Sequence, residues 1–349
     1  RQRQMCIRDR YRSYINESAL RQKAATRAVS ARSSFSDPGL SYQWHYNNTG
    51  ENEFDNQNDL GNGSEAGCDV GCTEAWQKCK GDPSIIVAVL DEGVMNTHPD
   101  LVGNIWINEG EELYADDDAD GNGYKDDKYG YNFVSNTGVI SWMETSDTGH
   151  GTHVAGTIAA MNNNGIGVCG IAGGDGTKNS GVKIMSCQVF SGDYGVSLDA
   201  EARAIKYAAD NGAVILQCSW GYNSPDANEA LGYIPGPKNE QDWENQYPLE
   251  KEALDYFIHN AGSPNGVIDG GLAIFASGNE YAPSSSFPAG YSKCISVSAI
   301  AADYTPSSYT NYGTEITLCA PGGDGDYYGT PGTAEDHFDW ETETQGLIL

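Results

Sequence analysis

The chain has 349 residues and carries 49 Asp and Glu against 20 Lys and Arg, and its length favours one large folded unit around a single core. Residues 1–32 hold nine of the basic side chains and two acids, which leaves residues 33–349 with an excess of 36 negative charges. Such an excess repels phosphates, so nucleic acid is a poor partner, and it favours bound cations. The longest apolar runs, such as 85–90, are far shorter than the roughly 20 residues that span a bilayer.

The N-terminal segment differs from the rest of the chain. The first ten residues, RQRQMCIRDR, have neither helical nor strand periodicity, and the segment lacks the apolar stretch of a signal peptide. We expect residues 1–41 to be poorly ordered, as foreign sequence or the remnant of a propeptide or linker. Residues 42–349 are then expected to form the main domain.

From residue 84 onward, short β-branched runs alternate with helical patterns. Helical spacing of apolar residues predicts helices over 198–209 and 249–260. Because runs such as 213–219 are apolar on both faces, helices must cover both sides of the sheet. The predicted fold is therefore α/β, a doubly wound and mostly parallel sheet. Strands are predicted over 84–90, 182–189, 213–219, 272–277, 293–299 and 315–319.

Two polar stretches and two groups of cysteines interrupt this pattern. Residues 103–148 and 222–246 are too long for ordinary connections, which predicts two insertions. Buried free thiols are expected for the cysteines within apolar runs, namely Cys187, Cys218, Cys294 and Cys319. A disulfide is favoured over a zinc site for those in a polar, Gly-rich stretch, namely Cys68, Cys72 and Cys79.

Three motifs lie where predicted strands end or a helix begins, at the edge where open parallel sheets bind ligands. One strand ends on Asp91, whose carboxylate can orient an imidazole. HGTHVAGTIAA, residues 150–160, predicts a helix with His150 in its first turn, able to act as general base and acid. Asn279 lies in the turn after the strand of LAIFASGNE and can donate to an oxyanion. Alone, Asp91 and Asn279 would each be read as a loop cap or turn residue.

An acidic stretch, DDDADGNGYKDDKYGYNF, places oxygen ligands at alternate positions with glycines for the sharp turn, as calcium requires. One register starts at Asp116 and ends at Asp127, and the other starts at Asp118 with Asp126 in ninth position. The alternative is a solvated acidic loop. The candidate calcium ligands are Asp116, Asp118, Asp120, Asn122, Asp126 and Asp127.

The motifs VAVLDEGV with HPDL, HGTHVAGTIAA and ASGNE, in this order, resemble the aspartate, histidine and oxyanion motifs of the subtilases, a family of serine peptidases. The resemblance runs from about Tyr42 to the C-terminus and implies a subtilisin-like three-layer fold. It implies that Asp91 orients the base, that His150 is the base and acid, and that Asn279 donates to the oxyanion. A similar DGNGYxDD insertion in many bacterial subtilases favours the second calcium register.

Two further segments resemble the family's substrate cleft. CSWG, residues 218–221, is similar to the edge segment that pairs with an extended peptide, and it implies that Ser219, Trp220 and Gly221 line the cleft. A second segment, Ala276, Ser277 and Gly278, resembles the opposite wall of the family's primary specificity pocket.

The family's nucleophile lies in a Gly-Thr-Ser-Met-Ala segment downstream of a stretch similar to EITLCAPGGD, residues 315–324, and no Gly-Thr-Ser triplet occurs in this sequence. We therefore expect the C-terminal part of the domain to be missing and the polypeptide as given to be inactive. The resemblance implies a secreted, cell-surface or periplasmic endopeptidase that binds calcium, cleaves polypeptides and is made with a propeptide. A peptide-binding pseudoenzyme and a calcium-dependent binding module stay open as alternatives.

Overall fold

The computed structural model describes residues 35–51, 64–143, 147–192, 194–262 and 268–323. Their main sheet has seven strands in the order β2-β3-β1-β6-β7-β8-β9, and every pair is parallel. The predicted fold class is confirmed. The strands are β1 (Ile86–Asp91), β2 (Gly130–Asn132), β3 (Lys183–Gln188), β6 (Ile215–Cys218), β7 (Leu272–Ala276), β8 (Ile295–Ile300) and β9 (Leu318–Pro321).

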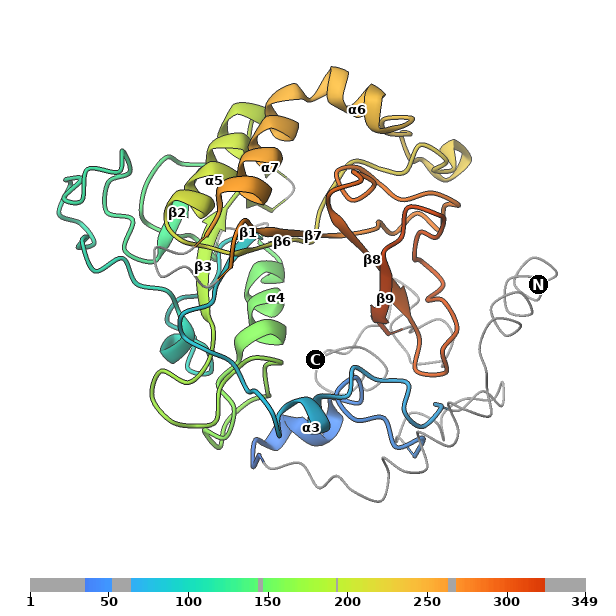
Figure 1. The fold of residues 1–349 in the computed structure, drawn as a ribbon, viewed down its shortest axis with the longest axis horizontal. Helices are drawn as coiled ribbons and strands as arrows, with labels where there is room; N and C mark the ends of the chain where they lie inside the picture. The colour runs from blue at the N-terminus through green and yellow to red at the C-terminus, as the bar shows by residue number, and fades with distance from the viewer. Residues whose placement is uncertain (1–34, 52–63, 144–146, 193, 263–267, 324–349) are drawn as a thin grey trace.

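Helices cover both faces of this sheet (Figure 1). On one face lie α5 (Leu198–Asp210) and α7 (Pro248–Asn260), and on the other lies α4 (His150–Ala159). Side chains alternate along β1 because successive residues of a strand point to opposite faces. Ala88 and Leu90 belong to the core beneath α5 and α7, whereas Val87 and Val89 pack with α4. The result is a three-layer domain in which β1 is an interior strand between β3 and β6.

The helix ends follow local chemistry. At the start of α5 the Ser197 hydroxyl accepts a hydrogen bond from the Ala200 N–H at 3.4 Å, a common N-cap arrangement. The helix ends before Gly212, whose φ of +87° suits glycine. Pro248 begins α7, where its missing N–H costs no helical bond.

The remaining elements are short. A separate antiparallel pair, β4 (Phe190–Ser191) and β5 (Tyr194–Gly195), follows β3. The 222–246 insertion contains η4 (Glu229–Leu231) and α6 (Glu240–Gln246), and it anchors on the fully buried Trp243. The other short elements are η1 (Pro38–Tyr42), α3 (Cys72–Ala75) and η3 (Val102–Asn104).

The N-terminal part of the described chain packs onto the domain. Phe35 contacts Trp76, with ring centroids 4.9 Å apart, and the Gly39 N–H donates to the Gly167 carbonyl at 2.8 Å. Residues 35–41, which the sequence placed with the N-terminal segment, therefore contact the core. The rest of that segment, residues 1–34, lies outside the described residues. Among the described residues, no helix combines the length and apolarity needed to cross a membrane.

The cysteines differ from expectation at two places. Cys319 is exposed, unlike the buried Cys187, Cys218 and Cys294, because β9 is the edge strand of the described sheet. The disulfide prediction is wrong in this structure, since all three thiols of the polar stretch are free: Cys68 and Cys72 are buried and Cys79 is exposed. Burial raises the pKa of Cys68 and of Cys72 to about 12, which makes both thiols unreactive.

Candidate active site

An aspartate and a histidine meet at the carboxyl end of the interior strand β1. Asp91 is the last residue of β1 and His150 the first of α4. The Nδ1 of His150 lies 2.7 Å from Oδ1 of Asp91. The Asp91 side chain is 3% exposed and the His150 side chain 49%. The carboxylate therefore fixes the ring through one nitrogen and leaves about half of the side chain open to solvent.

The pKa of His150 is raised above its ordinary value of 6.5, chiefly by the hydrogen bond to Asp91. Partial burial acts in the opposite direction, and the negative charges of Asp91 and Glu92 add to the increase. This environment stabilises the imidazolium that forms when a histidine takes a proton from a nucleophile. The pair can thus act as an acid–base centre.

A hollow of about 220 Å³ opens beside this pair. Ser219 and Trp220, which follow β6, line it together with Asp91 and His150. The Trp220 ring lies edge-on to Phe275, with centroids 5.4 Å apart. The structure therefore brings two of the predicted cleft residues to the predicted acid–base pair. The hollow's complete lining is Asp91, Glu92, Thr148, His150, Phe190, Gly192, Ser219 and Trp220.

The predicted oxyanion donor lies in the turn after β7. Asn279 is exposed there, next to Gly278, whose φ of +106° suits glycine. The amide of Asn311 holds this turn: its Nδ2 donates to the Ser277 carbonyl at 2.9 Å, and its Oδ1 accepts from the Glu280 N–H at 3.1 Å. No local sequence signal identified Asn311, because the contact joins segments about thirty residues apart.

A second hollow, of about 330 Å³, lies under this turn. Ser219 borders it as well as the first hollow, so the two adjoin. Gly221 lines neither of them. A Cβ on Gly221 would lie 2.7 Å from the Phe287 carbonyl oxygen, so glycine permits close backbone packing there. The predicted residues that border the second hollow are Ser219, Ala276, Ser277, Gly278 and Asn279.

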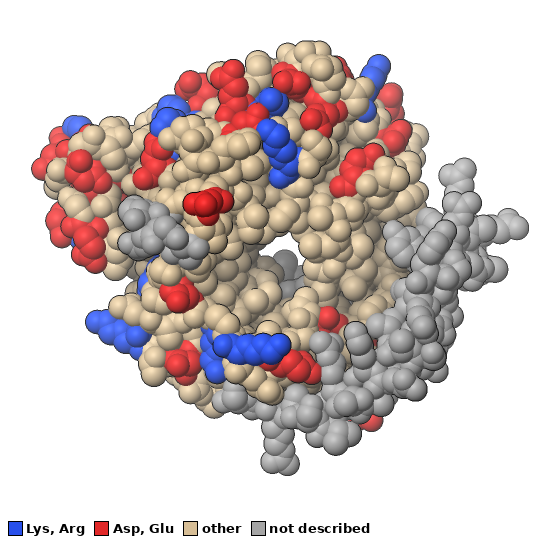
Figure 2. All heavy atoms as spheres, viewed as in Figure 1, with Lys and Arg blue, Asp and Glu red and all other residues tan. Residues whose placement is uncertain are grey.

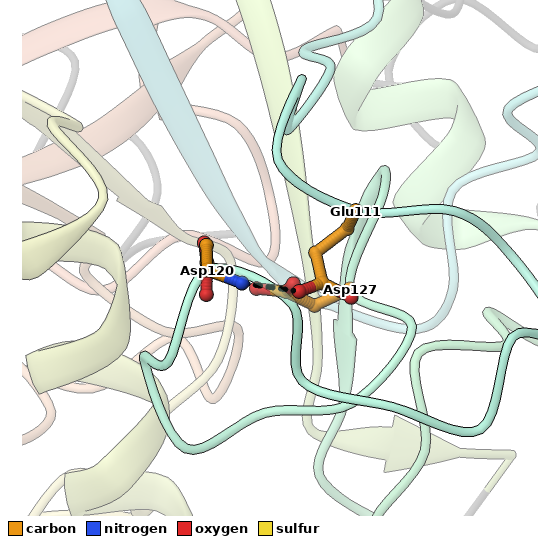
Figure 3. A group of neighbouring side chains, drawn as sticks. All are labelled: Glu111, Asp120 and Asp127. Atoms are coloured by element: carbon orange, nitrogen blue, oxygen red, sulfur yellow. Dashed lines mark hydrogen bonds between the residues drawn. The ribbon is translucent and has the colours of Figure 1, made fainter.

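Three carboxylates gather in the acidic loop that precedes β2 (Figure 3). Glu111, Asp120 and Asp127 each offer an oxygen, and these atoms lie within 4.8 Å of one another. Glu111 and Asp127 are buried, and burial is the main reason that the pKa of Asp127 is raised. Three neighbouring carboxylates repel one another unless a cation or a proton lies between them. Glu111 was not predicted as a ligand, because it lies outside the repeating D-x-D-x-N-G run.

The other candidate ligands differ in their hydrogen-bond partners. Asn122 donates to Asp120 and Asp127, at 3.1 and 2.9 Å. The buried Oδ1 of Asp118 has no hydrogen-bond partner among the described residues, while its Oδ2 accepts from the Gly123 N–H at 2.9 Å. The carboxylates of two candidates are not part of this group. Asp116 pairs with Lys125 at 3.0 Å, and the Asp126 side chain accepts from the Asp116 N–H at 2.9 Å, while the Asp126 backbone N–H donates to Glu111 at 3.2 Å.

The fold and the site define a class of protein. A parallel sheet that presents an aspartate-oriented histidine at its carboxyl edge is typical of α/β hydrolytic enzymes. Residues 82–346 match the Subtilase family model, Peptidase_S8. The chain therefore belongs to the subtilase family of serine proteases.

Two curated relatives and two solved structures illustrate the relationship. Halolysin of Haloferax mediterranei is 33% identical over 253 residues, which is 72% of this chain and 38% of halolysin. The halolysin-like extracellular serine protease Nep of Natrialba magadii is 29% identical over 73% of this chain and 37% of its own length. The chain thus matches less than half the length of each.

The solved structures support the fold. A serine protease of Aeromonas sobria, in complex with its chaperone, aligns with a TM-score of 0.60 at 20% identity, over 85% of this chain and 44% of that one. A protease from Pseudoalteromonas arctica aligns with a TM-score of 0.53 at 24% identity, over 84% of this chain and 73% of that one.

Proposed function

We propose that the protein containing this chain is a secreted, calcium-binding serine endopeptidase that hydrolyses polypeptides through an Asp-His-Ser triad. The observation that carries the proposal is the 2.7 Å contact between Asp91 and His150, with the ring beside the hollow lined by Ser219 and Trp220. The relative Nep is named an extracellular serine protease. The acidic face of this protein suits the same environment (Figure 2).

In the proposed mechanism, a serine hydroxyl attacks the carbonyl carbon of the peptide bond while His150 takes its proton. His150 then returns that proton to the leaving amine, and a water repeats the sequence to release the acyl group. Asp91 holds the ring and stabilises the imidazolium. Asn279 donates its amide hydrogen to the oxyanion, a contribution of about 10²- to 10³-fold in turnover. No Gly-Thr-Ser triplet occurs in the 349 residues, so we propose that the serine comes from polypeptide outside them.

Substrate is proposed to bind as an added strand beside the segment of residues 219–221 that follows β6. The small residues Ala276, Ser277 and Gly278 line the second hollow, and they are proposed as the opposite wall of the specificity pocket. Their size leaves room for a large substrate side chain.

Calcium is proposed to bind in the acidic loop. The carboxylate group of Glu111, Asp120 and Asp127 suits a hard cation that prefers oxygen ligands. So does the buried Oδ1 of Asp118, which has no hydrogen-bond partner in the part of the chain that the structure describes. Asp118, Asp120, Asn122 and Asp127 of the predicted set would hold the ion with Glu111. Asp116 and Asp126, which contact other groups of the loop, would shape the loop around it.

The test is to sequence the gene past Leu349, express the complete protein and assay cleavage of denatured casein. We expect a Gly-Thr-Ser segment, loss of hydrolysis when its serine becomes alanine, and a fall in kcat of about 10⁴-fold for Asp91→Asn. Full activity of His150→Ala would refute the proposal. A complete protein that binds casein peptides without cutting them would support the pseudoenzyme alternative.

A further inference from the structure

A second buried carboxylate lies directly beside the acid–base pair. Glu92 follows Asp91 at the end of β1 and is 7% exposed. Its carboxylate accepts the His150 backbone N–H at 3.1 Å, the Thr148 N–H at 3.1 Å and the Thr148 hydroxyl at 3.2 Å. His150 is therefore held at two points, its ring by Asp91 and its backbone by Glu92.

The helix that carries His150 has no cap of its own. Gly149 occupies the N-cap position with φ of +80° and provides no side-chain hydrogen bond. The first N–H groups of a helix need acceptors from elsewhere, and a negative charge there is favourable because it faces the positive end of the helix dipole. Glu92, which follows β1, provides both the acceptor and the negative charge for the start of α4.

Close packing fixes this contact. A Cβ on Gly151 would lie 2.2 Å from the Glu92 carbonyl oxygen, so the first turn of α4 rests on the backbone of residue 92. The backbone and the side chain of Glu92 therefore locate the same helix end.

We propose that Glu92 is a positioning residue, whose carboxylate caps the helix bearing His150 and so holds the imidazole in register with Asp91. The inference rests on the proposed function in treating His150 as the base. Three donors already engage the carboxylate, which argues against a primary role in binding a basic substrate side chain.

The charges around His150 define the control. Asp91 and Glu92 are the acidic residues that line the hollow, and the other lining residues from Thr148 to Trp220 are uncharged apart from His150 itself. Asp147 precedes the helix but accepts from the Gly192 N–H at 3.0 Å. Asp147→Asn thus removes a charge three residues from His150 without touching the cap.

The experiment compares Glu92→Ala, Glu92→Gln and Asp147→Asn in the complete peptidase, using kcat, KM and an NMR titration of the His150 ring. Glu92→Ala should lower kcat by about 10- to 100-fold with a smaller change in KM, because the base is misplaced. Glu92→Gln keeps an acceptor oxygen, so it should restore most of kcat. Both variants should lower the pH at which His150 titrates, because each removes a negative charge near the imidazolium. Asp147→Asn should titrate like the wild type.

The inference would be overturned if Glu92→Ala had the same kcat as the wild type and the same midpoint for the His150 titration. If the alanine variant does not fold, the titration of Glu92→Gln decides, and an unchanged midpoint there would overturn it equally. The titration does not depend on turnover, whereas the proposed function fails separately if His150→Ala retains hydrolysis.

Discussion

The indole nitrogen of Trp220 donates a hydrogen bond of 2.8 Å to the carbonyl oxygen of Leu90. Leu90 directly precedes Asp91 in β1, and Trp220 follows β6, so the bond ties one wall of the cleft to the strand that carries the aspartate. The Trp220 ring also lies edge-on to Phe190 and Phe275, with centroids 6.0 and 5.4 Å away. Cleft and acid–base pair are thus one packed unit.

Trp220→Phe should uncouple this unit. The substitution keeps an aromatic ring but leaves the Leu90 carbonyl without that donor, which costs about 1–3 kcal/mol. We expect a lower free energy of unfolding in urea, and a raised KM with little change in kcat in the complete peptidase. Trp142→Phe is the control, because the Trp142 indole nitrogen has no partner among the described residues. Equal losses in both variants would contradict the prediction.

Gly151→Ala should disrupt the docking of α4. The added Cβ would lie 2.2 Å from the Glu92 carbonyl oxygen, and overpacking of this kind costs about 1–3 kcal/mol. A thermal melt should show a lowered Tm. In the same helix, a Cβ on Gly156 meets no described atom within 4 Å other than its chain neighbours and the backbone of its own helix. Gly156→Ala in this chain should therefore raise stability by about 0.5–1 kcal/mol. A Tm for Gly151→Ala at or above that of the wild type would refute this account.

The elements that could be predicted are those with a local signal. The run IIVAVLD is apolar enough to be a central strand wherever it folds, and 198–209 shows helical spacing followed by Asn211-Gly212. The three-residue strand β2 has no such run, and it forms only because β3 provides a partner.

The parts of the site that were missed depend on contacts between distant segments. Glu111 reaches the acidic loop from outside its repeat, and Asn311 holds a turn about thirty residues earlier in the chain. Glu92 acts on a helix that begins 58 residues later. Residue type alone does not reveal such pairings, whereas Asp91 and His150 lie in motifs that can be read directly.

Calcium should stabilise the protein through the acidic loop. An ion at a hundred times its Kd adds about 2.7 kcal/mol to stability, so chelation should lower the Tm by several degrees. Asp127→Asn should remove most of this dependence. The asparagine oxygen can still accept the hydrogen bond that the Tyr207 hydroxyl donates to Asp127 at 2.7 Å.

Asp116→Asn is the matched control for the calcium measurement, because Asp116 is exposed and pairs with Lys125. It should keep the response to chelation. Loss of the response in Asp116→Asn alone would favour the register that starts at Asp116. If chelation leaves the Tm of the wild type unchanged, the acidic stretch is a solvated loop and not a calcium site.

A buried carboxyl pair should make stability depend on pH. Glu250 is fully buried and accepts from the Trp243 indole N–H at 2.6 Å. The carboxyl group of Glu201 interacts with that of Glu250, and the Oε1 atom of each is buried without a hydrogen-bond partner among the described residues. Burial is the main cause of the raised pKa of both groups, and the charge of Glu250 raises the pKa of Glu201 further.

The sign of the effect follows from the raised pKa values. The folded state holds a proton that the unfolded chain releases near pH 4.5, so the stabilisation is complete below that pH and is lost as the pH rises through the folded-state values. The free energy of unfolding in urea should therefore decline between pH 5 and the pH where the pair ionises. Glu201→Gln should flatten this decline, because it removes one of the two titrating groups and its charge. If the variant and the wild type decline in parallel, the Glu201–Glu250 pair is not the source of the pH dependence.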